Sequence, residues 1–277
     1  MEFEALGTHW WIESPAALKR KTDINKAIEQ VDRTWSRFRD DSLVAQMATV
    51  PARYPLNESD IDLLEWYKSL YDATDGLVTP LIGQTLSDAG YDKDYSLQPA
   101  ARIQPTPNWD EVIELGRDAV TIKQPHLIDV GAAGKGYAVD QVARLLDGDF
   151  CVDAGGDMVI GNKAMRIGLE DPRDHSKLIG VVEISNASIC GSAVNQRAWR
   201  DWHHVINPKT SRPAKGILAT WAISDNAMHA DGLATALFFV SPKQLEGLAP
   251  LKYCIMYDDG TVRASADSSI TIFTEKN

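Results

Sequence analysis

The sequence predicts an α+β fold in which antiparallel β-sheets pack against helices. Strand-like and helix-like segments are interspersed along the 277 residues without the regular alternation of a parallel sheet. Residues 253–265, YCIMYDDGTVRAS, are typical of an antiparallel hairpin, with Asp-Gly supplying the positive φ angles of the turn. No repeat, linker or low-complexity tract interrupts the chain. We therefore expect one unit over residues 1–277, or two subdomains that divide around residues 77–126.

The first expected elements are a strand and a helix. Residues 3–13 alternate between apolar and polar side chains, as a half-buried strand does. The next apolar residues recur at intervals of four and three and form one face of a helix: Ile24, Ile28, Val31, Trp35 and Phe38. A heptad seam between two chains would show the same spacing, but this run is too short for one. We therefore expect the face to pack on the core.

A second helix is expected from about Ser59 to the residues before Gly76. Ser59 and Asp62 have the S-x-x-D spacing of a capping box. The side chains expected to face the core are Ile61, Leu64, Tyr67 and Tyr71. Five prolines then fall within residues 77–126, which predicts loops and short strands that wrap a site or an edge.

Residues 127–146, LIDVGAAGKGYAVDQVARLL, predict a strand, a glycine-rich loop and a helix that begins near Tyr137. The double glycine in residues 150–161, FCVDAGGDMVIG, predicts a turn between two strands. Further strands are expected at 165–169, 180–184, 189–191, 218–223 and 269–273. Helices are expected over 229–240 and 243–248.

The bulk composition narrows the possible functions. A formal net charge of −11 argues against nucleic acid or an anionic membrane as the main partner, because both favour basic surfaces. No run of about 18 apolar residues is present to span a bilayer. The three cysteines are sparse and widely spaced, so we expect small buried side chains rather than disulfides or a zinc cluster. No signal peptide is visible, which predicts the cytoplasm, or the periplasm if an export segment has been removed.

The glycine loop at residues 131–136 suggests phosphate binding but matches neither common phosphate motif. G-x-x-x-x-G-K-[ST] needs a hydroxyl after its lysine, and G-x-G-x-x-G is present only in reverse order. The small residues would let a ligand approach the backbone, the next helix would direct amides at an anion, and Lys135 would add positive charge. The alternative is a tight strand–helix turn with Lys135 in solvent.

A second glycine turn lies at Gly155-Gly156, between Asp153 and Asp157. Such a turn permits close backbone approach, as a flat ring or a pyrophosphate would need. A β-turn with polar corners is an almost equal alternative.

Two oxygen-bearing residues lie one turn apart on the expected helix at 229–240. Asp231 and Thr235 are at positions i and i+4, so they share a helix face. A carboxylate and a hydroxyl there suit Mg²⁺, which prefers oxygen ligands and keeps several waters. The alternative is that the helix dipole favours Asp231 in the first turn and that Thr235 only packs.

His203 and His204 are adjacent in a strand-like segment. Neighbouring strand residues point to opposite faces, so at most one of the two would line a site. A zinc site built from His203, His204, His229 and Asp231 is a weaker alternative, because these residues lack a recognised ligand spacing.

Seven short stretches, taken in order, resemble the FAD:protein FMN transferase family, also called ApbE-like. They are ALGT (5–8), SRFRDDS (36–42), TDG (74–76), DVGAAGKGYAVD (129–140), DAGGD (153–157), HVINP (204–208) and ADGLATAL (230–237). Each stretch is weak alone, but seven in the same order are hard to obtain by chance. The resemblance covers most of the chain, from Leu6 to about Phe239.

The resemblance implies a two-layer α+β fold with an FAD cleft between its two parts. It implies a Mg²⁺-dependent enzyme that splits FAD, transfers FMN to a Thr or Ser hydroxyl of a target flavoprotein and releases AMP. Two alternatives stay open. One is a Mg²⁺-dependent FAD pyrophosphatase that yields FMN and AMP, and the other is a flavin-binding protein without catalysis.

The resemblance also implies roles for individual residues. The implied metal site consists of Asp231, Thr235, the carbonyl of Ala132 and Ala234. The implied FAD contacts are Leu6, Phe38, Asp129, Lys135 and Val205. His204 would lie at the flavin or the reacting phosphate. His204 is the expected general base for the acceptor hydroxyl, and Asp231 is the second candidate.

The chain departs from the family pattern at four places. Leu6 stands where the family has Met, and Asn207 stands where it has Asp. The segment DGLVTPLIG at 75–83 is shorter and lacks the second aspartate of D-G-x-F-D-P-T, and residues 190–199 follow T-S-G-x-x-x-R only loosely. The Leu6 departure is minor because Leu and Met are nearly isosteric, whereas the other three bear on substrate preference more than on the class of reaction.

Overall fold

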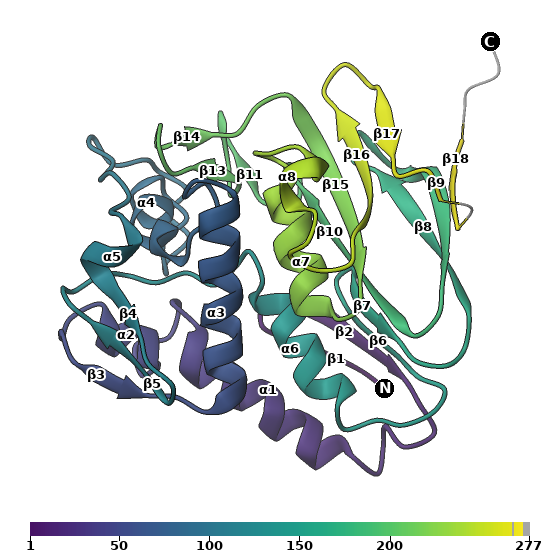
Figure 1. The fold of residues 1–277 in the computed structure, drawn as a ribbon, viewed down its shortest axis with the longest axis horizontal. Helices are drawn as coiled ribbons and strands as arrows, with labels where there is room; N and C mark the ends of the chain where they lie inside the picture. Colours follow the sequence, from purple (N-terminus) through teal and green to yellow (C-terminus); the bar gives the residue numbers. More distant parts are fainter. Residues whose placement is uncertain (268, 274–277) are drawn as a thin grey trace.

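The computed structural model describes residues 1–267 and 269–273 (Figure 1). Its centre is an eight-stranded antiparallel sheet with the strand order β1-β2-β6-β7-β10-β15-β16-β17. These strands are β1 (Glu2–Ala5), β2 (Thr8–Glu13), β6 (Cys151–Ala154), β7 (Asp157–Ile160), β10 (Ala187–Ala193), β15 (Ile217–Ser224), β16 (Lys252–Tyr257) and β17 (Val262–Ala264). The predicted α+β fold with antiparallel sheets is confirmed.

The central sheet separates two apolar cores. Side chains alternate across a strand, so in β10 Ile189 lies in one core and Cys190 in the other. A three-stranded sheet covers the Ile189 face, in the order β18 (Ile270–Ile272), β9 (Asp174–Ile184) and β8 (Met165–Asp171). Helices α6 (Gly134–Ala143) and α7 (Ala227–Ala236) cover the opposite face (Figure 1). The sheet therefore sits between a helical layer and a second β-layer.

Two longer helices form the outer part of the helical layer. Helix α1 (Lys21–Trp35) contacts α6, and α3 (Glu58–Ala73) contacts α7. The expected apolar face of α1 is buried through Ile24, Ile28, Val31 and Trp35. The remaining elements on this side are α2 (Leu43–Met47), β3 (Arg53–Pro55), α5 (Trp109–Val112), β4 (Ile113–Leu115), β5 (Ala119–Ile122) and α8 (Pro242–Leu245).

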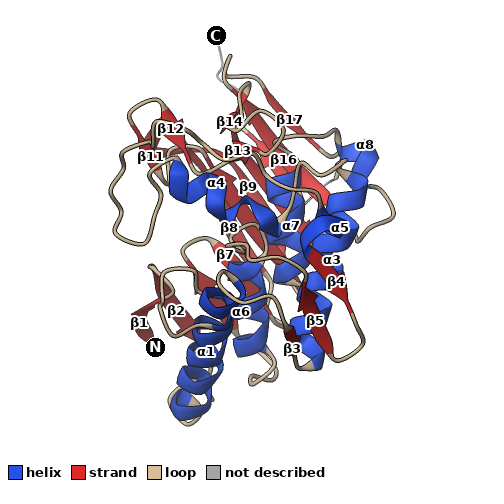
Figure 2. Cartoon of the chain, turned by 90° about the vertical axis from the view of Figure 1, so that its left-hand side faces the viewer, coloured by secondary structure: helices blue, strands red, loops and turns tan. Residues whose placement is uncertain are grey.

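A third, smaller core joins the proline-rich segment to the histidine-bearing loops. It includes Leu86 of α4 (Gly83–Asp88), which follows the 3-10 turn η1 (Pro80–Ile82). Its other contributors include residues of β11 (Ala198–Trp199), β12 (Trp202–His203) and β13 (Ile206–Asn207). Strand β11 pairs with β12, and β13 pairs with β14 (Arg212–Pro213). Figure 2 shows the arrangement of these backbone segments, with α4 on the same side of the molecule as β11 and β12. Residues 77–126 are thus loops with short strands, as predicted, but they also form η1, α4 and α5.

The N-terminal strand prediction is wrong in one respect. Residues 3–13 are not one strand but the hairpin of β1 and β2, in which Ala5 pairs with Thr8. Leu6 and Gly7 form its two-residue turn with φ values of 51° and 71°. Two positive φ angles match the twist of an antiparallel pair, and a leucine in this conformation is under backbone strain.

The helix boundaries also differ from those predicted. Helix α1 ends at Trp35, so Phe38 lies in the following turn rather than on the helix face. Helix α3 begins two residues after Leu56, and Asn57, not Ser59, caps it by accepting a hydrogen bond from the Asp60 amide. Asn57 is a strong capping residue in its own right, which the S-x-x-D pattern concealed.

The predicted strand before the glycine loop is absent from the described chain. Residues 127–130 pair with no strand, and α6 begins at Gly134 rather than near Tyr137. The C-terminal hairpin is present, but only Gly260 of its turn has a positive φ angle. The amide of Gly260 donates to the Tyr257 carbonyl, so the connection is a three-residue loop.

The other predicted strands are confirmed as β6 to β10, β15 and β18, most of them longer than expected. The predicted helix at 243–248 is a single turn, α8. The division into two subdomains stays a prediction; Val78 and Leu81 from the intervening segment pack in the same core as α1 and α7. In the described part of the chain, no helix combines the length and apolar character needed to cross a membrane.

Candidate active site

A cavity of about 930 Å³ opens where the helical layer meets the third core. Nine residues named from the sequence line it: Leu6, Phe38, Asp129, Ala132, Lys135, His204, Val205, Asp231 and Thr235. Ala234 does not; it is fully buried, and its carbonyl accepts a hydrogen bond of 2.7 Å from the Thr220 hydroxyl. The cavity therefore gathers segments that lie far apart in the sequence.

Close contact between α6 and α7 joins the two main motifs. A Cβ atom on Gly136 would lie 2.1 Å from the Ala227 carbonyl oxygen, so only glycine fits there. The amide of Gly136 donates a hydrogen bond of 3.0 Å to Oδ2 of Asp231. At the start of α7, Asp140 of α6 accepts hydrogen bonds from the amides of Ala227 and Met228 at 2.9 and 2.8 Å.

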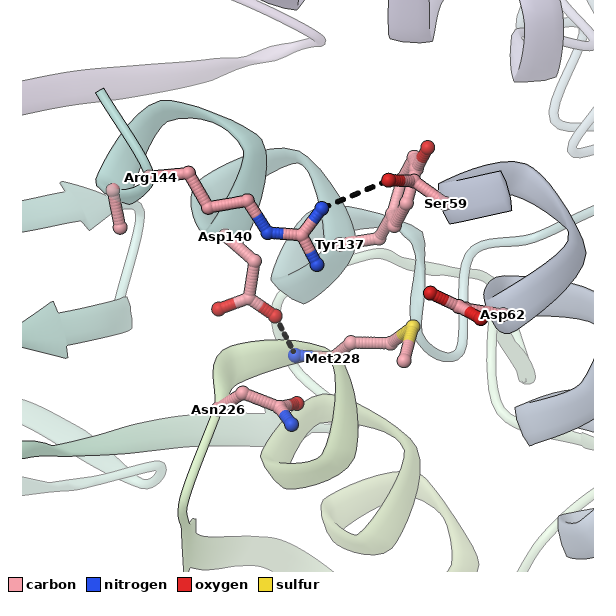
Figure 3. A pocket seen from close by; sticks show the side chains of 8 residues that line it. Ser59, Asp62, Tyr137, Asp140, Arg144, Asn226 and Met228 are labelled. Carbon is pink, nitrogen blue, oxygen red and sulfur yellow. Dashed lines mark hydrogen bonds between the residues drawn. The ribbon is translucent and has the colours of Figure 1, made fainter. Parts of the chain in front are cut away.

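Asp140 also borders a second, smaller cavity of about 310 Å³ between α3, α6 and α7 (Figure 3). Figure 3 shows its carboxylate bonded to Met228, and the Arg144 guanidinium bonded to the Ser59 hydroxyl across the cavity. Burial raises the pKa of Asp140 to about 6, although the two helix amides stabilise its charge. This carboxylate fixes the start of the helix that carries Asp231.

Asp231 belongs to α7, and its carboxylate lies almost completely buried against the N-terminus of α6. Burial raises the pKa of its carboxyl group, whereas the charge of Lys135 and the amides of Gly136 and Lys135 oppose that rise. The positive end of the α6 dipole thus faces a side chain of the protein itself. The expectation that these helix amides would hold a ligand anion is therefore not met.

The loop before α6 also uses its amides internally. The Tyr67 hydroxyl accepts hydrogen bonds of 3.0 Å from the amides of both Ala132 and Ala133. The amide of Gly131 donates to Asp129 at 2.6 Å. The Ala132 carbonyl instead points toward α7, where the Thr235 hydroxyl lies 3.4 Å away. The loop therefore offers carbonyl oxygen, not amide hydrogen, to the site.

Asp231, Thr235 and the Ala132 carbonyl together present a carboxylate, a hydroxyl and a carbonyl oxygen on one wall of the cavity. This all-oxygen donor set suits a hard divalent cation such as Mg²⁺. The zinc alternative is not supported, because no cluster of three or more His, Cys, Asp or Glu side chains is arranged around a metal position in residues 1–267 and 269–273. His229 instead bonds Asp225 at 2.8 Å and packs on Trp66.

Lys135 is not free in solvent. Its ammonium forms an ion pair with Asp157, the first residue of β7, whose side chain has no exposed surface. The same ammonium lies 3.9 Å from Oδ1 of Asp231. Sequence reasoning identified Asp157 only as a turn corner, because nothing local indicates a partner 22 residues away.

Arg37 is a site residue that sequence reasoning missed. Its side chain is 2% exposed, and its Nε donates to Oδ2 of Asp129 at 2.5 Å. Its guanidinium carbon lies 4.2 Å from the ring centre of Phe38 and 4.8 Å from that of Tyr91. One terminal nitrogen, Nη2, is buried without a hydrogen-bond partner among the described residues. The basic residue beside Phe38 in SRFRDDS was the available signal.

Aromatic rings form the wall beside Arg37. Phe38 stacks on Tyr95 with ring centres 5.3 Å apart and an interplanar angle of 7°, and Tyr91 packs against both. Tyr95 is 53% exposed. Flat apolar faces next to a cation suit a ligand with an aromatic ring and a negatively charged part.

His204 lies on the cavity wall, whereas His203 turns away and bonds the Ala214 carbonyl. Burial, aided by the nearby charge of Arg197, lowers the pKa of His204 to about 3. The ring is therefore neutral at physiological pH. Its Nδ1 is buried without a hydrogen-bond partner in the described chain.

All three cysteines are buried and free, as expected.

The fold and the cavity define an α+β protein with a large site. One side of the site carries the rings of Phe38, Tyr91 and Tyr95, and another carries Lys135 and the oxygen atoms of Asp231, Thr235 and Ala132. The ApbE family model matches residues 6–254. The chain therefore belongs to the ApbE family, which confirms the resemblance carried by its motifs.

Curated relatives agree with this assignment. The chain is 23% identical over 282 residues to a FAD:protein FMN transferase of Klebsiella pneumoniae, covering 89% of this chain and 79% of that protein. It is 26% identical over 279 residues to a FAD:protein FMN transferase of Treponema pallidum, covering 86% and 77%.

Solved structures share the fold. The ApbE protein of Thermotoga maritima superposes with a TM-score of 0.82 at 24% identity, covering 96% of both chains. The flavin transferase ApbE of Vibrio cholerae superposes with a TM-score of 0.77 at 21% identity, again covering 96% of both.

Proposed function

We propose that this protein transfers FMN from FAD to a Thr or Ser hydroxyl of a target flavoprotein in a Mg²⁺-dependent reaction that releases AMP. The observation that carries the proposal is the meeting of two motifs in one cavity. Asp231 and Thr235 of α7 face the Ala132 carbonyl of the glycine loop, with Lys135 beside them. The transferase activity of the curated relatives supports the same conclusion.

The size and walls of the cavity fit FAD. About 930 Å³ lies near the upper end of the range for small-molecule sites, as a dinucleotide requires. The rings of Phe38, Tyr91 and Tyr95 would pack on a flat ring system. Arg37 and Lys135 supply the positive charge that phosphates need in a chain whose net charge is −11.

Asp231, Thr235 and the Ala132 carbonyl would hold the cation. When bound, Mg²⁺ supplies Lewis-acid stabilisation of the negative charge that develops on the pyrophosphate. The main task of the protein residues is positioning and charge neutralisation, as in other phosphoryl transfers. Lys135 would place its ammonium at the phosphate oxygens, and the loop would fix the carbonyl.

In the proposed step, the acceptor hydroxyl oxygen forms a bond to the phosphorus of the FMN half. The bond from that phosphorus to the bridging oxygen breaks, and AMP leaves with the bonding electron pair. The neutral ring of His204 would take the hydroxyl proton. Phosphate charge beside His204 would raise its pKa from the low value of the free protein and make it a stronger base.

The test is incubation with FAD, Mg²⁺ and a candidate flavoprotein domain, followed by intact-mass analysis of that domain. An added FMN mass and release of AMP are expected. Asp231→Asn should abolish both while the protein stays folded. Asp225→Asn, a matched exposed carboxylate at the start of the same helix, should keep activity.

The other outcomes separate the alternatives. Free FMN and AMP without a modified acceptor would indicate the pyrophosphatase. Bound FAD that is not split would indicate a flavin-binding protein without catalysis. Turnover that survives in Asp231→Asn would contradict the proposed metal site.

A further inference from the structure

We propose that Asp157 is a positioning residue that holds the ammonium of Lys135 away from Asp231, and so keeps Asp231 available to a divalent cation. The inference rests on the proposed function, because the cation is the one that the transferase site would bind.

Asp157 is buried in a way that requires a cationic partner. It directly follows the Gly155-Gly156 turn and is the first residue of β7, with no exposed surface. Its Oδ2 accepts a hydrogen bond from the Lys135 ammonium, and its Oδ1 is buried without a hydrogen-bond partner in the described chain. A buried carboxylate is costly unless a charge or donors compensate it, so Asp157 and Lys135 stabilise each other.

Lys135 has a second carboxylate within reach. Its Nζ lies 3.9 Å from Oδ1 of Asp231, which is beyond hydrogen-bond distance but close enough for a small side-chain rotation to connect them. A lysine stem is flexible and its ammonium acts as a point charge. Two buried carboxylates therefore compete for one ammonium, and in this structure Asp157 binds it.

The position of this ammonium decides what Asp231 can bind. If the Lys135 ammonium bonded Asp231 directly, it would occupy one of the carboxylate oxygens and place a positive charge at the position that the divalent cation needs. Bonded to Asp157, the ammonium stays 3.9 Å from Oδ1 of Asp231, a residue that lines the cavity together with Thr235. Loss of the Asp157 charge would release Lys135 to its nearest remaining carboxylate, Asp231.

Asp153 provides a matched control on the other side of the same glycine turn. Its carboxylate accepts a hydrogen bond of 2.8 Å from the Gly156 amide, which an asparagine oxygen would preserve. Burial raises the pKa of Asp153, and the charge of Lys135 opposes the rise, so the two groups feel each other. Replacing Asp153 removes one nearby negative charge without releasing Lys135.

The experiment measures Mn²⁺ binding to the purified protein without FAD, by the electron paramagnetic resonance signal of free Mn²⁺. Asp157→Asn should weaken binding by about 10- to 100-fold, as loss of a supporting residue around a metal site does. Asp153→Asn should stay close to wild type. The double variant Asp157→Asn/Lys135→Met should recover most of the affinity, because the competing ammonium is gone.

Wild-type affinity in Asp157→Asn would overturn the inference, as would a double variant as weak as the single one. Mn²⁺ binding that is absent from the wild type would also overturn it. If Asp157→Asn does not fold, the double variant Asp157→Asn/Lys135→Met, which leaves neither buried charge of the pair, is compared with the wild type, and a loss of Mn²⁺ affinity of more than about tenfold would count against the idea. FMN transfer is scored separately, so its absence alongside the expected Mn²⁺ shifts would reject only the proposed function.

Discussion

The backbone amide of Gly136 donates a hydrogen bond of 3.0 Å to Oδ2 of Asp231, and so joins two residues that lie 95 positions apart. The bond forms because Gly136 has no side chain to separate α6 from α7. The geometry of the site thus depends on the absence of a Cβ atom at residue 136.

Gly136→Ala should destabilise the protein and reduce FMN transfer together. The new Cβ would lie 2.1 Å from the Ala227 carbonyl oxygen and 2.9 Å from the Asp231 Cβ, which forces the two helices apart. Overpacking of this kind costs about 1–3 kcal/mol of the free energy of unfolding. Urea denaturation and the transfer assay measure the two effects. Gly116→Ala, whose Cβ would have one close neighbour, the Ala119 carbonyl oxygen at 3.2 Å, should cost less stability than Gly136→Ala and leave FMN transfer unchanged.

Thr235→Val should raise the Mg²⁺ concentration needed for half-maximal FMN transfer by about tenfold or more, because it removes one of the proposed oxygen ligands and keeps the shape of the side chain. Thr220→Val is the control. Its hydroxyl donates to the Ala234 carbonyl at 2.7 Å in the adjacent core, so its loss should cost about 1 kcal/mol of stability and leave the Mg²⁺ requirement unchanged. An equal shift in both variants would contradict a metal role for Thr235.

Arg37→Lys should lower stability and raise the KM for FAD. Lysine keeps the charge but cannot both bond Asp129 through Nε and lie flat on the rings of Phe38 and Tyr91. The expected loss in the free energy of unfolding is about 1–3 kcal/mol. Arg33→Lys, in an exposed ion pair with Glu29, should change neither quantity measurably. A normal KM in Arg37→Lys would argue that this guanidinium does not meet the ligand.

His204 should make the protein less stable in acid. Its pKa is near 6.5 in the unfolded chain and about 3 in the folded protein, so the unfolded state takes up the proton first as pH falls. Stability is therefore lost progressively between these two values. His204→Gln should remove about 2 kcal/mol of the stability difference between pH 7 and pH 5. Urea denaturation at both pH values tests this, and identical pH dependence in the two proteins would contradict it.

Much of the fold could be predicted because its strands and helices have strong local periodicity. The alternation in β2, which buries Trp10 and Ile12, and the spacing of Ile24, Ile28 and Val31 each reflect one buried face. Boundaries were harder, because a turn or a cap depends on single backbone conformations. Leu6 adopts a positive φ of 51°, although a leucine at that position does not indicate a turn as a glycine would, and Asn57 rather than Ser59 caps α3.

The location of the candidate site was predictable where two residues share one helix, because Asp231 and Thr235 at i and i+4 both line the cavity as expected. It was not predictable where function depends on charge pairs between distant segments. Arg37 meets Asp129 across 92 positions, and Lys135 meets Asp157 across 22. No local pattern encodes such a pair, because only the folded chain determines which buried charge compensates which.

The lining of the cavity from Leu6 to Phe239 also has a consequence for synthesis. The hairpin of β1 and β2 is synthesised before β6, the strand that becomes the neighbour of β2 in the sheet, where Trp10 pairs with Ala154. The oxygens of Asp231 and Thr235 leave the ribosome later still. A nascent chain therefore cannot complete this cavity until α7 has emerged, so the glycine loop and the N-terminal hairpin must be held in place by other contacts before the site can form.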